Sequence, residues 1–138
     1  MAQKVRDAMT SNPMTIEPGR PVADAARIMK DADTGIVPVV DGARLVGTIT
    51  DRDIAIRVVA EGKDPESTKV TEIASTDVVT VDPQQDLDEA LRLMTQHQVR
   101  RLPVVEEDGR LVGVIAQADV ARSADDRRTG EFVEEISK

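Results

Sequence analysis

Two short segments of the sequence combine side chains that can hold a small ligand. The first runs from Gly47 to Asp53 and places Thr50 three residues before Asp53, with Arg52 in between. The carboxylate of Asp53 can accept charge-assisted hydrogen bonds from both vicinal hydroxyls of a sugar. Thr50, Arg52 and the free N–H groups of a helical first turn can meet a phosphate, because helix N-termini attract anions. The alternative is that Thr50, Asp51 and Asp53 only cap a helix, as residues of these types routinely do.

The second segment, from Gly113 to Asp119, keeps only part of this pattern. Asp119 retains the carboxylate, but Ala116 replaces the hydroxyl residue and Ala118 replaces the arginine. The phosphate end of this segment is therefore weakened. We expect two unequal sites, of which the first is the better binder and the second is weak, empty or suited to a different ligand.

Other chemistry finds little support in the sequence. The absence of cysteine excludes disulfides, thiolate metal sites and thiol catalysis. His97 is the sole histidine, whereas a zinc site needs three or four ligands. No nucleophile stands beside a general base. We therefore expect no catalytic residue, no dedicated metal site and no required cofactor, with magnesium present only if it accompanies a bound triphosphate.

Composition narrows the partners. The formal net charge of −8 repels a phosphate backbone, and Phe132 is the only aromatic residue, so nucleic-acid binding is not expected. No run of the sequence approaches the roughly 20 apolar residues of a membrane helix, and the N-terminus has no apolar signal stretch. We expect a soluble, cytoplasmic protein without membrane contact.

An internal repeat sets the domain organisation. Displacing the sequence by about 65 residues aligns many identical positions, which is typical of a duplicated unit. The aligned positions include Thr15 with Thr80, Pro18 with Pro83, Pro38–Val40 with Pro103–Val105, and Leu45–Gly47 with Leu111–Gly113. We interpret the chain as a repeat over 4–60, a polar linker over 61–68, a second repeat over 69–124 and a C-terminal extension over 125–138.

Each repeat predicts the same elements: strand, helix, strand, strand and helix, preceded by a short helical turn. Apolar residues at helical spacing predict helices that begin near Val22 and Leu87. Short β-branched runs predict a hairpin in each repeat, closed by Asp41-Gly42 and by Asp108-Gly109. A unit of under about 60 residues buries too little surface to be robust alone, so the two sheets should pack around a pseudo-twofold axis. The expected strands span 14–16, 36–40, 44–50, 78–81, 102–105 and 110–116, and the helical turns 5–9 and 70–74.

The tandem repeat, the order of elements, the Pro-Val-Val strands and the Gly47–Asp53 segment with its weaker copy together resemble the cystathionine-β-synthase-type (CBS) domain family. The resemblance covers about residues 4–124. It implies an α+β Bateman module, in which two β-α-β-β-α repeats enclose two clefts. Members of this family commonly bind AMP, ADP, ATP or S-adenosylmethionine there, and often form disk-shaped homodimers.

The resemblance also assigns residues to both clefts. In the first cleft, Met14, Thr15, Ile16, Val37 and Pro38 match positions that enclose the adenine, and Thr50, Arg52 and Asp53 match the phosphate and ribose positions. In the second, Thr80, Val81, Leu102, Pro103 and Asp119 match, and Arg101 with its neighbour Arg100 can supply cationic donors. The alternatives are that the apolar residues only form core and that the arginines are solvated surface charges.

The leading hypothesis is therefore a stand-alone regulatory module. It senses an adenosine-containing nucleotide and signals to an unidentified protein in trans. The rival hypothesis is an interaction scaffold of the same fold whose clefts have lost ligand binding. The weakened second segment favours the rival, and the intact Thr50–Asp53 pattern opposes it.

Overall fold

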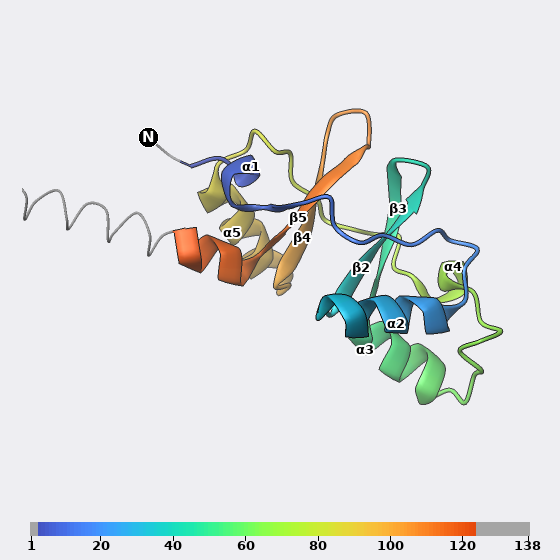
Figure 1. Ribbon diagram of the computed structural model, residues 1–138. Coiled ribbons are helices and arrows are strands. Elements are labelled where there is room, and N and C mark those ends of the chain that lie inside the picture. The colour runs from blue at the N-terminus through green and yellow to red at the C-terminus, as the bar shows by residue number, and fades with distance from the viewer. Residues whose placement is uncertain (1–2, 124–138) are drawn as a thin grey trace, which may run out of the picture.

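The computed structural model describes residues 3–123 and contains two hairpins with helices packed against them (Figure 1). In chain order the elements are α1 (Val5–Ala8), β1 (Thr10–Ser11), α2 (Val22–Ala32), β2 (Ile36–Asp41), β3 (Arg44–Thr50), α3 (Asp51–Ile54), the π-helical turn η1 (Ala55–Val59), α4 (Val70–Ile73), α5 (Leu87–His97), β4 (Arg101–Val105) and β5 (Leu111–Ala116). The chain is helical again over 117–123. None of the helices within residues 3–123 is long and apolar enough to cross a membrane.

The two hairpins form as the sequence predicts. Strand β2 pairs antiparallel with β3, and β4 pairs in the same way with β5. Gly42 (φ 65°) and Gly109 (φ 89°) occupy the turns, where a positive φ favours glycine. The hairpins also contact each other near their tips, because the N–H of Leu45 donates to the carbonyl of Gly109 at 3.1 Å. The N–H of Leu111 in turn donates to the carbonyl of Ala43 at 3.0 Å.

Helices α2 and α5 cover the hairpins with the apolar faces that their spacing predicts. Val22 and Met29 of α2 are buried in one core, and Leu87 and Met94 of α5 are buried in another. The two cores have the same design, because each contains one long helix and one hairpin. The α+β class is thereby confirmed.

Helices α1 and α4 each complete the core of the opposite repeat. Val5 of α1 is fully buried in the core of the second repeat, and its N–H donates to the carbonyl of Gln85 at 2.8 Å. Val70 of α4 is fully buried in the first core, and its N–H donates to the carbonyl of Arg20 at 2.8 Å. The short strand β1 likewise pairs with β5, which makes a three-stranded sheet. Neither core is therefore complete without the segment that begins the other repeat.

The strands expected over 14–16 and 78–81 are reduced to single parallel bridges, Ile16 with Val39 and Val81 with Val104. In the first, the N–H of Ile16 donates to the carbonyl of Pro38, and the N–H of Val40 donates to the carbonyl of Ile16. The next hydrogen bonds of a parallel ladder would need N–H groups from Pro18 and Pro38, and proline has none. In the same way, Pro83 and Pro103 prevent the second bridge from extending into a ladder.

Candidate functional site

The Thr50–Asp53 segment lies where β3 passes into α3. The N–H of Thr50 donates to Oδ2 of Asp53 at 2.9 Å, and the N–H of Asp53 donates to Oγ1 of Thr50 at 3.1 Å. This reciprocal pair is a capping box, so the capping interpretation holds. It leaves other atoms available, since within residues 3–123 nothing donates to Oδ1 of half-buried Asp53. The same two side chains can therefore cap the helix and still offer a carboxylate oxygen and a hydroxyl proton to a ligand.

The backbone N–H groups in the first turn of α3 are less available to a ligand than the sequence suggests. The N–H of Asp51 donates to the carbonyl of Gly35 at 3.0 Å, and the N–H of Arg52 donates to Oδ1 of Asp51 at 2.8 Å. Together with the N–H of Asp53, every N–H group from 51 to 53 has an acceptor within the chain. The expectation that free N–H groups meet a phosphate is therefore not met, and a phosphate here would be bound by side chains.

The five residues expected around the base divide by burial. Ile16 and Val37 belong to the first core, and Pro38 is also buried. Met14 is 58% exposed, and Thr15 is partly exposed. Ile16 is bridged to Val39 of β2, and Ile36 at the start of the same strand pairs with Thr50. Met14 is thus the exposed apolar side chain of this group, while the other three apolar residues are buried.

The residues assigned to the first cleft are called the first set below, namely Met14, Thr15, Ile16, Val37, Pro38, Thr50, Arg52 and Asp53. Those assigned to the second cleft are the second set, namely Thr80, Val81, Arg101, Leu102, Pro103 and Asp119. The second set shows the same division by burial. Val81, Leu102 and Pro103 are buried, and Thr80 is exposed. Asp119 is only 9% exposed, and both of its carboxylate oxygens have donors. Oδ2 accepts the N–H of Ala116 at 2.9 Å, and Oδ1 accepts a hydrogen bond from the guanidinium of Arg122. In the described part of the chain, Oδ1 of Asp53 has no donor, whereas Oδ1 of Asp119 already accepts the hydrogen bond from Arg122.

Arg101 begins β4, where its backbone pairs with Ala116, but its side chain extends toward the first repeat. A Cβ atom at Gly35 would lie 3.2 Å from Nη1 of Arg101 and 2.9 Å from Oδ2 of Asp51. Gly35 thus leaves room for an arginine of one repeat to approach an aspartate of the other. The sequence could not reveal this approach, because it depends on how the repeats pack.

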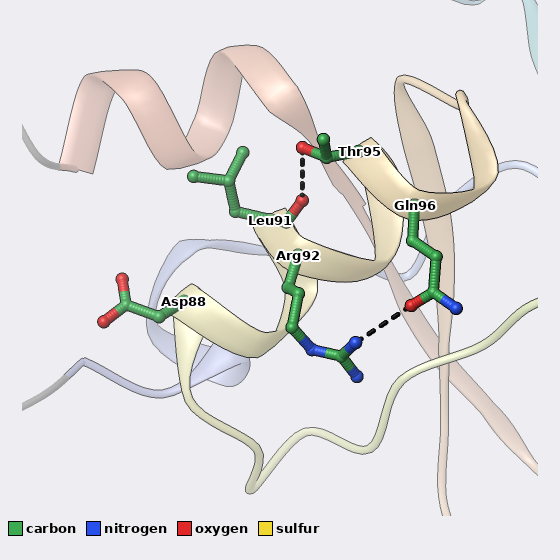
Figure 2. A pocket seen from close by; sticks show the side chains of 5 residues that line it. All are labelled: Asp88, Leu91, Arg92, Thr95 and Gln96. Atoms are coloured by element: carbon green, nitrogen blue, oxygen red, sulfur yellow. Dashed lines mark hydrogen bonds between the residues drawn. The ribbon is translucent and has the colours of Figure 1, made fainter.

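Two hollows of the surface are lined by none of these residues. One, on the outer face of α5, is lined by Asp88, Leu91, Arg92, Thr95 and Gln96 (Figure 2). Arg92 donates to Gln96 at 2.9 Å across this face, and its ion pair with Glu89 raises the pKa of the guanidinium. The other is lined by Asp82, Pro83, Gln84, Glu106, Glu107 and Asp108. In the described part of the chain, no three histidine or carboxylate side chains are grouped to hold a metal ion.

Comparison with known proteins identifies the family. The CBS domain model matches twice, over residues 5–60 and 70–126. The chain therefore belongs to the CBS domain family and is a tandem pair of CBS repeats.

A similar relative is Hypoxic response protein 1 of Mycobacterium tuberculosis, which is 37% identical over 132 residues, or 95% of this chain and 92% of that protein. A crystal structure of Hypoxic Response Protein I with two coordinated zinc ions matches with a TM-score of 0.80 at 38% identity, over 87% of this chain and 98% of that one.

Two further solved structures contain adenosine compounds. CBSX2 in complex with AMP matches with a TM-score of 0.80 at 27% identity, over 91% of this chain and 98% of that one. The CBS domain pair of protein MJ0100, in complex with 5′-methylthioadenosine and S-adenosyl-L-methionine, matches with a TM-score of 0.82 at 26% identity, over 92% of this chain and 99% of that one.

Proposed function

We propose that this CBS pair is a regulatory module that binds an adenosine-containing nucleotide at the first set of residues and signals to a partner protein. The observation that carries the proposal is the state of Asp53. Its carboxylate caps α3 through Oδ2 and leaves Oδ1 for a ribose hydroxyl, next to the hydroxyl of Thr50. The AMP and S-adenosylmethionine complexes of the related CBS pairs support the choice of ligand class.

The two sets of residues are proposed to be unequal. The carboxylate of Asp119 is already paired with Arg122, so a ribose must compete with that guanidinium for the carboxylate. The second set also lacks the threonine and the arginine of the first, since Ala116 and Ala118 stand in their places. We expect one nucleotide to bind at the first set before any binds at the second.

Calorimetric titration with AMP, ADP, ATP, NAD and S-adenosylmethionine tests the proposal. Asp53→Asn is the informative variant because asparagine can still cap the helix, which separates ligand binding from folding. Asp119→Asn is the matched control. The proposal expects saturable binding that weakens at least tenfold in Asp53→Asn and changes little in Asp119→Asn. No binding of any of these compounds to the folded native protein would contradict it.

The rival scaffold function is favoured by the occupied carboxylate of Asp119. A scaffold needs a surface for another protein, and Val59 of η1 is 70% exposed near Ile56, which is also exposed. We propose that exposed apolar helix residues of this kind support a homodimer, in agreement with the family resemblance. A monomeric mass in light scattering at micromolar concentration would contradict the dimer.

Regulation of a partner, rather than catalysis, and a cytoplasmic location complete the proposal. Within residues 3–123, His97 takes part in no side-chain hydrogen bond, so no nucleophile is paired with it there. We expect bound nucleotide to be recovered unchanged after prolonged incubation. Stoichiometric conversion of ATP or AMP by the purified protein would instead support an enzyme.

A further inference from the structure

We infer that Met14 is a site of reversible oxidation, at which hydrogen peroxide converts the thioether to a sulfoxide and thereby weakens nucleotide binding at the first set. The inference rests on the proposed function and adds to it a form of regulation. It starts from the composition, because a chain without cysteine offers an oxidant no sulfur other than the thioethers of its methionines.

The methionines of the described chain differ in their access to an oxidant. Met14 is 58% exposed, whereas Met29 is 9% exposed in the first core and Met94 is 2% exposed in the second. Met9 is partly buried against the second core, and its Sδ lies 2.7 Å from where a Cβ at Gly113 would be. Because an oxidant must touch the sulfur, peroxide should reach Met14 before the other three.

The chain holds Met14 outside both cores by fixing the residues on either side of it. Before it, β1 pairs with β5 through Thr10 and Ser11. After it, the N–H of Ile16 donates to the carbonyl of Pro38 at 3.0 Å, and the Ile16 side chain is buried in the first core. Met14 lies on the short span between these anchors and belongs to neither core. Oxidation at this position therefore leaves the packing of both cores intact.

Oxidation changes what Met14 offers to a ligand. One oxygen of the peroxide is transferred to Sδ: the O–O bond breaks, an S–O bond forms, the sulfur loses two electrons, and the other oxygen leaves as water with both protons. The sulfoxide is polar, whereas the thioether is apolar. Since Met14 is the exposed apolar side chain of the first set, its oxidation removes apolar surface that an adenine would cover.

The second set has no counterpart that peroxide can oxidise. The repeat that aligns Thr15 with Thr80 places Val79 at the position of Met14, and valine has no sulfur. Val79 also packs, partly buried, against the second core. Peroxide should therefore weaken binding at the first set alone.

Mass spectrometry and calorimetry together test the inference. The native protein, Met14→Leu and Met9→Leu are each treated with hydrogen peroxide and quenched, their tryptic peptides are analysed for added oxygen, and AMP is titrated. We expect the sulfoxide at Met14 to form before any at Met9, Met29 or Met94, and saturating AMP to slow its formation. A methionine sulfoxide reductase should then restore the thioether and the affinity for AMP.

The two variants locate the effect. Oxidation should lower the affinity for AMP about fivefold or more in the native protein and in Met9→Leu, which keeps Met14. Met14→Leu should keep after treatment whatever affinity it has before treatment, because leucine has no sulfur. An equal fall in Met14→Leu and in the native protein would assign the effect to another methionine and overturn the inference.

Three further results are decisive. If AMP binds the native protein and the form oxidised at Met14 retains that affinity, the inference is wrong and the proposed function stands. Oxidation of Met9, Met29 or Met94 ahead of Met14 would also overturn it. If AMP does not bind the folded native protein, the inference is wrong, and titration with the other nucleotides decides the proposed function.

Discussion

Replacing Val5 by alanine tests the exchange of segments between the repeats. Val5 belongs to the first repeat by sequence, yet it is fully buried in the core of the second, beside Leu87 and Met94. Removing two carbon atoms from a fully buried site costs about 1.6 kcal/mol in transfer free energy, and the cavity left behind raises this to about 2 kcal/mol. In a chain of this size, that loss lowers Tm by roughly 6–10 °C.

Urea denaturation should show this loss, and hydrogen exchange should locate it. Amides of α5, β4 and β5 are expected to lose protection in Val5→Ala more than those of β2 and β3. Arg6→Ala is the control because it changes the next residue of the same helix, whose side chain is exposed. If Val5→Ala and Arg6→Ala are equally stable, or if protection is lost first in β2 and β3, then α1 does not complete the second core.

Three further predictions concern separate contacts. Arg122→Ala should free Oδ1 of Asp119 and strengthen nucleotide binding at the second set by up to about fivefold. Calorimetric titration in an Asp53→Asn background measures this effect. Unchanged weak binding there would show that the ion pair is not the obstacle. Gly47→Ala should lower Tm by several degrees, because its Cβ would lie 2.7 Å from the carbonyl oxygen of Ser75. Gly19→Ala, which has open space around it, should leave Tm unchanged. Equal Tm values for the two variants would refute the close contact. The hydrogen bond from Arg92 lowers the pKa of the Glu89 carboxyl, so this pair stabilises the fold at neutral pH, and the effect is lost as pH falls through the lowered pKa. The difference in unfolding free energy between the native protein and Glu89→Gln should therefore shrink between pH 7 and pH 3. A constant difference would contradict this reasoning.

Local patterns predicted the hairpins and long helices well. The spacing of Val22, Ala25 and Met29 places one face of α2 in the core, and Gly42 closes the first hairpin where the sequence predicts a turn. These features depend on a few neighbouring residues. The ladder at Ile16 was overestimated because two prolines, each acceptable in a strand alone, fall where both flanking hydrogen bonds are needed.

The remaining features depend on contacts between distant segments. Nothing in the sequence around Val5 indicates that it packs beside Leu87, because an alternative core lies nearer in the chain. The approach of Arg101 to Asp51 depends on the packing of the repeats and on the absence of a side chain at Gly35. The pairing of Asp119 with Arg122 is local and could have been found from their helical spacing.

Amide chemical shifts followed by NMR during an AMP titration test the central claim most directly. We expect shifts to concentrate at residues 14–16, 35–37, 50–53 and 101, and to saturate at one equivalent. Residues 78–81 and 116–119 should move only at higher AMP concentrations. Early shifts centred on 78–81 and 116–119, or no shifts in either set, would contradict the account.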